Sequence, residues 1–166
     1  MTSTADRTTA GVTDSPRTVS VSHVYRASVE AAYDAWINPR SLEQWFGPPG
    51  FRTEVLAHDP RVGGEWRFRM IGPNDVVYHH FGAFVEISPP RRLVFTWASD
   101  EQVEGWRDEN GAPTRVTVDF HRRNDGVAVR ITHERLQSED AHRALTGGWS
   151  GGLEALDDFL KGSKSQ

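Results

Sequence analysis

Alternation of apolar and polar side chains dominates the chain from residue 19 to residue 133 and predicts a protein built mainly of strands. Val19 and Val21 alternate with Ser20 and Ser22, the pattern of a strand with one buried face. Turn-forming sequences, such as Asn-Asp-Gly at 124–126, separate the alternating stretches. The predicted strands are 19–26, 51–58, 66–70, 76–87, 93–98, 115–121 and 127–133.

Three segments carry helical signals instead. Ser28 is a favourable N-cap for a short helix that ends at Asn-Pro 38–39. A second short helix contains Leu42 and Trp45 and stops at the Gly-Pro-Pro-Gly run 47–50. The third begins at 138–140 and extends to about Lys161. The order of one strand, two helices, six strands and a helix predicts an α+β domain built on an antiparallel meander.

The last helix contains four glycines, Gly147, Gly148, Gly151 and Gly152. A glycine in a helix interior costs about 0.5–1 kcal/mol relative to alanine, so four in one stretch are a large local cost. Their i,i+4 spacing leaves one flank of the helix without side chains. We therefore expect another backbone or a bound molecule to approach this flank, and one curved sheet gripping the helix to leave a cavity there.

Length and composition favour one domain, 17–162, preceded by a disordered tail, 1–16, which is rich in Thr, Ser, Ala and Asp. The chain has no cysteine, no apolar run long enough for a membrane span and no signal-peptide pattern. We expect a soluble cytoplasmic protein without a membrane partner. The net charge of −4 arises from an acidic loop, 99–113, and no dense basic cluster exists, which argues against nucleic-acid binding.

Several motifs occur together in a recognisable order. They are Trp-Phe-Gly-Pro at 45–48, Gly-Gly-Glu-Trp at 63–66, Gly-Ala-Phe-Val-Glu-Ile-Ser-Pro-Pro at 82–90, Arg-Leu-Val-Phe-Thr-Trp at 92–97, and Gly148-Trp149 followed by Leu153 and Leu156. With them the chain resembles the START-like (SRPBCC) superfamily, in the branch named for the activator of the ninety-kDa heat-shock chaperone ATPase. The resemblance covers about residues 18–161.

The resemblance implies a helix-grip fold: a curved antiparallel sheet of six to seven strands wraps a long C-terminal helix around a hydrophobic cavity, with two short helices after the first strand. It also implies a ligand, since superfamily members bind lipids, polyketides, hormones or aromatic antibiotics, and some are enzymes. The branch has no shared catalytic residue set to carry across. Residues 1–16 do not resemble the separate chaperone-binding domain of the namesake co-chaperones, so we do not expect chaperone activation.

Aromatic side chains are the clearest candidates for a binding site, because an apolar pocket with few polar groups suits an aromatic, polyketide-like or lipid-like molecule. A strand shifted by one residue would exchange Phe84 for Val85 or His80 for Phe81. The candidate wall residues are Trp45, Phe46, Trp66, Phe68, His80, Phe84, Phe95, Trp97, Phe120, Trp149 and Leu153.

Two other functions compete with simple binding. An enzyme of cyclase or hydratase type would use His80 or Glu86 as a base, and their i,i+6 spacing would keep both on one sheet face if Glu86 points inward. For His80 and His133, a role in the cavity as a hydrogen-bonding group or base competes with the favoured interpretation, a histidine that is satisfied by the protein or solvated. A chaperone or regulator interaction module would use Trp106 in the acidic loop.

Metal ligation is not expected, because His79 and His80 point to opposite faces and no metal-binding spacing occurs. No cofactor is predicted. A homodimer and a chaperone contact are additional hypotheses, and the sequence names no particular ligand.

Overall fold

The computed structural model of the chain describes residues 17–47, 49–99, 113–136 and 139–164. Within these ranges it confirms the predicted α+β class and the order of elements. The strands are β1 (Val19–Tyr25), β2 (Arg52–His58), β3 (Glu65–Ile71), β4 (Val77–Ser88), β5 (Arg92–Ser99), β6 (Thr114–Arg123) and β7 (Gly126–Glu134). The helices are α2 (Val29–Ile37), α3 (Pro39–Trp45) and α4 (Glu139–Lys164), with a short 3-10 turn η1 (Pro73–Asp75). The predicted tail 1–16 and nearly all of the acidic loop, including Trp106, lie outside the described residues.

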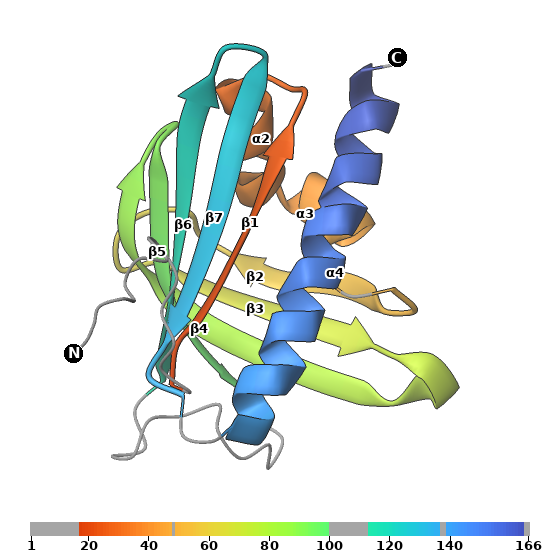
Figure 1. Ribbon diagram of the computed structural model, residues 1–166. Coiled ribbons are helices and arrows are strands. Elements are labelled where there is room, and N and C mark those ends of the chain that lie inside the picture. Colours follow the sequence, from red (N-terminus) through yellow and green to blue (C-terminus); the bar gives the residue numbers. More distant parts are fainter. Residues whose placement is uncertain (1–16, 48, 100–112, 137–138, 165–166) are drawn as a thin grey trace, which may run out of the picture.

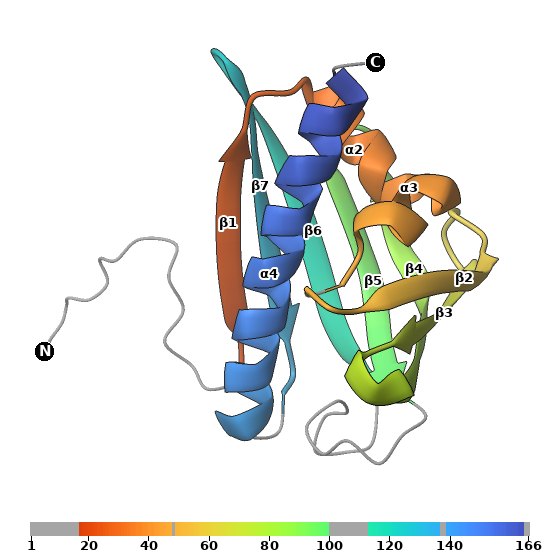
Figure 2. The ribbon, with the colours of Figure 1, turned by 90° about the vertical axis from the view of Figure 1, so that its right-hand side faces the viewer.

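The strands form one antiparallel sheet in the order β1-β7-β6-β5-β4-β3-β2. From β2 to β7, each strand pairs with the next strand in the sequence. The first strand, β1, pairs with the last, β7, and Val21 lies opposite Ile131. Figures 1 and 2 show the sheet curving around α4, which crosses its open side, with α2 and α3 beside the C-terminal half of that helix. This is the helix-grip arrangement.

The two short helices begin where capping residues place them. The Ser28 hydroxyl accepts a hydrogen bond from the backbone N–H of Ala31 at 3.0 Å and caps α2. The Asn38 side chain accepts one from the N–H of Arg40 at 2.9 Å, and Pro39 follows as the first helical residue of α3. The Ser28 cap is a local sequence signal, so the predicted start of α2 agrees with the structure. Asn38 was predicted only to end the first helix, and the structure shows that it also caps the second.

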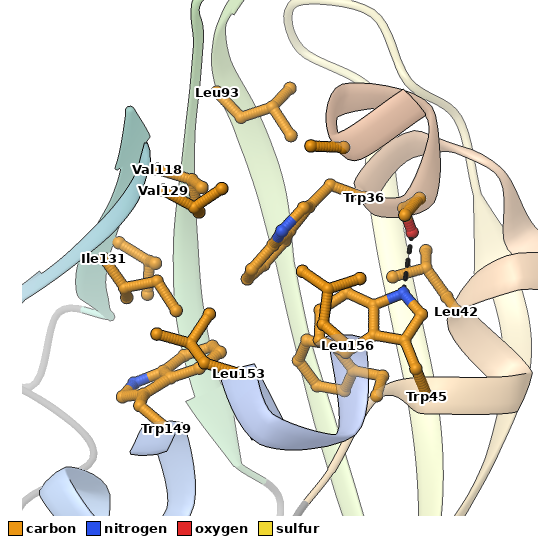
Figure 3. Packing of buried hydrophobic residues seen from close by; sticks show 14 of the residues in the cluster. Trp36, Leu42, Trp45, Leu93, Val118, Val129, Ile131, Trp149, Leu153 and Leu156 are labelled. Carbon is orange, nitrogen blue, oxygen red and sulfur yellow. Dashed lines mark hydrogen bonds between the residues drawn. The ribbon is translucent and has the colours of Figure 1, made fainter. Parts of the chain in front are cut away.

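Buried aromatic and aliphatic side chains from all layers form one core. Figure 3 shows Trp36 and Trp45 of the short helices packing toward Leu156 of α4, with Val118 and Ile131 of the sheet on the opposite side. The middle of α4 is also tied to β1, because the buried Tyr25 hydroxyl donates a hydrogen bond to the Leu153 carbonyl at 2.8 Å. No helix in the described ranges combines the length and the hydropathy that crossing a membrane requires.

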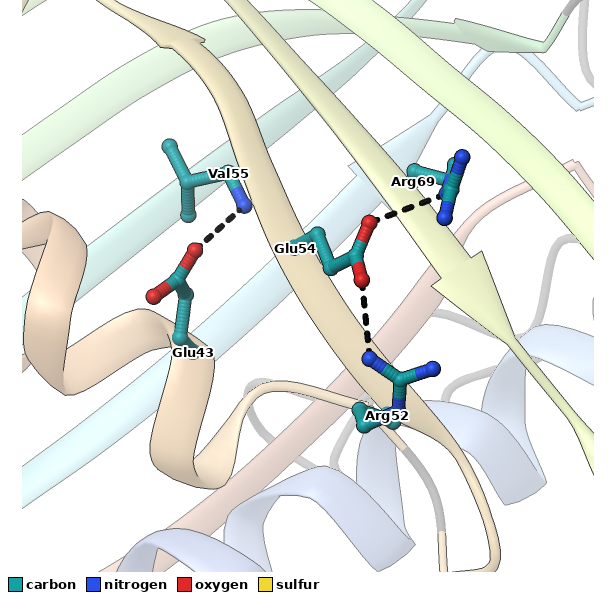
Figure 4. Close-up of polar contacts among 5 residues, drawn as sticks. All are labelled: Glu43, Arg52, Glu54, Val55 and Arg69. Carbon is teal, nitrogen blue, oxygen red and sulfur yellow. Dashed lines mark hydrogen bonds and ion pairs between the residues drawn. The ribbon is translucent and has the colours of Figure 1, made fainter.

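Polar contacts fix α3 against the edge of the sheet. Glu43 of α3 accepts a hydrogen bond from the backbone N–H of Val55 at 2.9 Å, beside a register irregularity in edge strand β2 (Figure 4). On the same strand Glu54 pairs with Arg52 at 2.8 Å and with Arg69 of β3 at 2.9 Å. These contacts satisfy part of an exposed strand edge and hold in place the helix that ends at Trp45.

Candidate ligand-binding cavity

A cavity of about 360 Å³ lies between α4, the C-terminal end of α3 and the inner faces of β3, β4 and β5. Phe51, Tyr78 and Gly148 are half-exposed and Ala144 is exposed, so these residues form its rim. The lining residues are Trp45, Phe46, Gly47, Phe51, Met70, Tyr78, His80, Trp97, Ala144, Leu145, Gly148, Trp149 and Gly152.

Three tryptophans, Trp45, Trp97 and Trp149, give this wall its apolar character. The indole N–H of Trp45 donates to the Ala35 carbonyl at 2.9 Å (Figure 3), and that of Trp149 donates to His133 at 3.1 Å. Both N–H groups are therefore bonded to the protein. Trp149 packs edge-on against the ring of Trp97, with centroids 5.3 Å apart. Such edge-to-face contacts hold rings in fixed orientations.

His133 lies behind the wall and fixes Trp149. Its Nδ1 accepts the indole N–H of Trp149, and its Nε2 lies 2.7 Å from the hydroxyl of Thr114. That hydroxyl donates to the Trp97 carbonyl at 2.7 Å, so it accepts from Nε2–H and the imidazole is neutral. Burial, with a smaller effect of the nearby His80, lowers the pKa of His133 to about 3. His133 therefore positions a wall residue and is not itself among the residues that line the cavity.

The glycine flank of α4 opens onto the cavity at Gly148 and Gly152. A β-carbon added to either residue would meet no atom within 4 Å outside the local helix backbone. Of the two expected neighbours of this flank, another backbone or a bound molecule, no protein atom in the described ranges fills the place of the first at these two positions. Gly147 also has no neighbour within 4 Å, but it is exposed and does not line the cavity.

β4 supplies the polar part of the wall through Tyr78 and His80. The two side chains lie two residues apart on one face of the strand, and their rings are nearly parallel at 11°, with centroids 6.4 Å apart. His80 is buried, and its ring centroid lies 5.0 Å from that of Trp97. Val85 is exposed and Phe81 packs under the guanidinium of Arg67, so the alternative strand register is not adopted.

Five of the predicted wall residues line the cavity: Trp45, Phe46, His80, Trp97 and Trp149. Four others, Trp66, Phe68, Phe84 and Phe95, surround a separate void of about 20 Å³ deeper in the core. Phe120 packs instead against Tyr33, and Leu153 is buried where its carbonyl accepts the bond from Tyr25.

Glu86 lies on the outer face of the sheet, away from His80. The register of β4 against β5 shifts between Phe84 and Glu86, and this irregularity reverses the alternation that the i,i+6 spacing assumed. Glu86 instead lines a shallow outer surface with Arg92 and Asp119, and its carboxylate accepts a hydrogen bond from Ser88 at 2.8 Å. The structure thus separates the two residues proposed as an acid/base pair.

Several lining residues were not among the predicted wall, although their signals were present. Met70 shares a strand face with Trp66 and Phe68, and Tyr78 shares one with His80. Leu145 precedes Trp149 by one helical turn. In the described ranges, no group of three His, Asp or Glu side chains is placed to hold a metal ion.

Comparison with known proteins gives a family and a fold. Residues 26–161 match the family described as Activator of Hsp90 ATPase homolog 1-like protein. No curated protein matches the sequence.

Solved bacterial structures align over nearly their whole lengths. A protein from Chromobacterium violaceum is 25% identical with a TM-score of 0.78, and the alignment covers 88% of this chain and 98% of that one. A protein from Arthrobacter aurescens is also 25% identical with a TM-score of 0.75, and the alignment covers 92% of this chain and 91% of that one. A Silicibacter pomeroyi protein named AHSA1 is 21% identical, with a TM-score of 0.71 and coverage of 87% and 97%, and shows the fold alone.

Proposed function

Because the chain belongs to the family of Activator of Hsp90 ATPase homolog 1-like proteins, whose fold encloses a cavity here, we propose that it binds a small hydrophobic molecule in that cavity. An aromatic, polyketide-like or lipid-like compound suits a wall made of indole and phenyl rings. The observation that carries the proposal is the pairing of this aromatic wall with the open glycine flank at Gly148 and Gly152.

The size and chemistry of the cavity agree with such a ligand. Its volume of about 360 Å³ lies in the lower part of the range of small-molecule sites, about 300–1,000 Å³. A ligand that buries about 300 Å² of apolar surface would gain about 7 kcal/mol from desolvation. Loss of its translational and rotational freedom offsets part of this gain, so we expect dissociation constants weaker than about 10 μM, in the high-micromolar to millimolar range.

The glycines support the same function. Alanine at Gly148 or Gly152 would favour the helix by up to about 1 kcal/mol each, and neither position is crowded. Packing therefore does not require glycine at either position. A bound molecule lying against the helix backbone would require it, because any side chain there would occupy the ligand's space.

Two single variants test the proposal, each with the same glycine-to-leucine substitution at one of two adjacent positions. Gly148→Leu places an isobutyl group in the cavity, whereas Gly147→Leu places it in solvent and serves as the control. Binding of the neutral fluorophore N-phenyl-1-naphthylamine would be followed by its emission and by quenching of tryptophan fluorescence. We expect at least a tenfold loss of affinity for Gly148→Leu and wild-type affinity for Gly147→Leu.

Two outcomes would contradict the proposal. The wild-type protein could fail to bind the fluorophore at any accessible concentration, or both leucine variants could bind it equally well. Either result would favour an interaction module acting through Trp106 in the 99–113 loop.

A further inference from the structure

The cavity is open at its rim and closed at its buried wall. Phe51, Tyr78 and Gly148 lie at the rim and are half-exposed. Behind the buried wall lies the separate void, which has a volume of about 20 Å³. Among the described residues, Phe46 and Trp97 are the two that line both spaces, so their side chains form the partition between the cavity and the void.

Phe46 and Trp97 form this partition as a stacked pair. Their ring planes are inclined by 30°, and the ring centroids lie 5.9 Å apart. On the deeper side, the centroid of Phe46 lies 5.1 Å from that of Phe68. The centroid of Trp97 lies 5.1 Å from that of Trp66. Trp149, which lines the cavity, packs edge-on against both rings of the pair. Aromatic contacts therefore support the partition on both of its sides.

Phe46 is fixed in its position in this partition. Its backbone N–H donates to the Leu42 carbonyl at 3.0 Å where α3 ends, and its carbonyl accepts a hydrogen bond from the buried Thr53 hydroxyl at 2.8 Å. The Phe46 ring cannot turn away from the cavity, because the void behind it has room for about one water molecule and not for a phenyl ring. The partition is therefore a fixed floor of the cavity.

A fixed floor limits how deep a ligand can reach. As long as a ligand fits between the rim and the floor, each added methylene group is buried and strengthens binding by about fourfold. Once the ligand reaches the floor, further methylene groups extend through the rim into water and add little to the affinity.

We propose that Phe46 sets the depth of the cavity, and that the site therefore binds compact hydrophobic molecules in preference to long-chain ones. The inference rests on the proposed function and narrows its ligand class, because a long alkyl chain would remain partly in water. Trp97 completes the floor, but it lies within β5, and its carbonyl accepts a hydrogen bond from Thr114. Phe46 follows the end of a short helix, so its side chain can be shortened without altering a strand.

A homologous series of 4-alkylphenols, from ethyl to octyl, measures this depth. Their dissociation constants are obtained from the displacement of N-phenyl-1-naphthylamine. For the wild-type protein, we expect the affinity to rise by about fourfold per methylene group for the shorter chains and to level off before octyl. A rise that continues unchanged to octyl would overturn the proposal, because no floor would then limit the ligand.

Two phenylalanine-to-alanine variants assign the limit to a residue. Phe46→Ala opens the floor, so the affinity should continue to rise to a longer chain before it levels off. Phe84→Ala is the matched control, because it removes an equally buried ring that lines only the inner void and leaves the partition in place. We expect this control to level off at the same chain length as the wild type. An unchanged limit in Phe46→Ala, or an equal extension in both variants, would overturn the assignment to Phe46.

Phe46→Leu provides the same test if Phe46→Ala fails to fold. Leucine fills more of the space than alanine, so the limit should move to a longer chain by a smaller amount. A limit that stays at the wild-type chain length in Phe46→Leu would overturn the assignment. Failure of the fluorophore and of every alkylphenol to bind the wild-type protein would instead contradict the proposed function.

Discussion

A single buried histidine connects the stability of the protein to the shape of its cavity. His133 accepts the indole N–H of Trp149 and donates to Thr114, which in turn donates to the carbonyl of Trp97. Two of the three cavity tryptophans thus belong to one hydrogen-bonded chain. The arrangement requires a neutral imidazole, because Nδ1 must remain an acceptor.

This requirement predicts a pH-dependent stability. Burial lowers the pKa of His133 from 6.5 to about 3, so the unfolded chain takes up the proton first as the pH falls. The contribution of neutral His133 to the free energy of unfolding is fully present above pH 6.5 and is lost as the pH falls from 6.5 to about 3. From pH 7 to pH 5 it lowers the free energy of unfolding by about 2 kcal/mol.

His133→Gln removes the titrating group and checks this prediction. Urea denaturation at pH 7 and pH 5 should show a loss that is about 2 kcal/mol larger for the wild type than for the variant. His58, whose pKa is lowered mainly by burial, is retained in both proteins and contributes equally. Equal losses in the two proteins would mean that His133 titrates normally in the folded state.

At the level of secondary-structure elements, two tyrosines offer a matched test of how α4 is anchored to β1. Burial, with a smaller effect of Asp157, raises the pKa of Tyr25, whose hydroxyl donates to the Leu153 carbonyl of α4. Burial raises the pKa of Tyr33 to about 12, but its hydroxyl has no hydrogen-bond partner among the described residues. The same chemical change therefore has different consequences at the two positions.

Tyr25→Phe should lower the free energy of unfolding by about 1 kcal/mol, because it removes the bond between β1 and α4. Tyr33→Phe should leave it unchanged or raise it, because a buried hydroxyl without a partner is removed. Thermal or urea denaturation measures both. Equal effects of the two substitutions would show that the Tyr25 hydrogen bond does not anchor α4.

Elements were predictable from the sequence because their signals are local. Alternation, the cap at Ser28, the Asn-Pro pair at 38–39 and the turn residues lie within a few positions of the boundaries they set. The irregularity between Phe84 and Glu86 was not predictable, because it depends on how β4 pairs with β5. That one displacement moved Glu86 to the outer face and separated it from His80.

At the scale of the whole molecule, the sequence indicated a cavity more clearly than it indicated the residues that line it. The alternation of apolar and polar residues predicts which side chains of a strand face the helix. It does not predict at which residue of the strand the packed core ends and the cavity begins. Trp66, Phe68 and Met70 share one face of β3, yet only Met70 reaches the cavity. The glycine flank was easier to predict, because four glycines in one helix carry a stability cost that needs a cause, and no packed neighbour among the described residues supplies one at Gly148 or Gly152.

The central claim is that the space over the glycine flank of α4 is a binding site for a small hydrophobic molecule, for which 2-naphthol serves as an aromatic probe. The most direct measurement is a ¹H–¹⁵N correlation spectrum of the protein titrated with 2-naphthol, read at the glycine amides. The account predicts saturable shifts at Gly148 and Gly152, with no shift at Gly126, the first residue of β7. Shifts confined to Gly126 and other sites outside the cavity, or an unchanged spectrum, would contradict it.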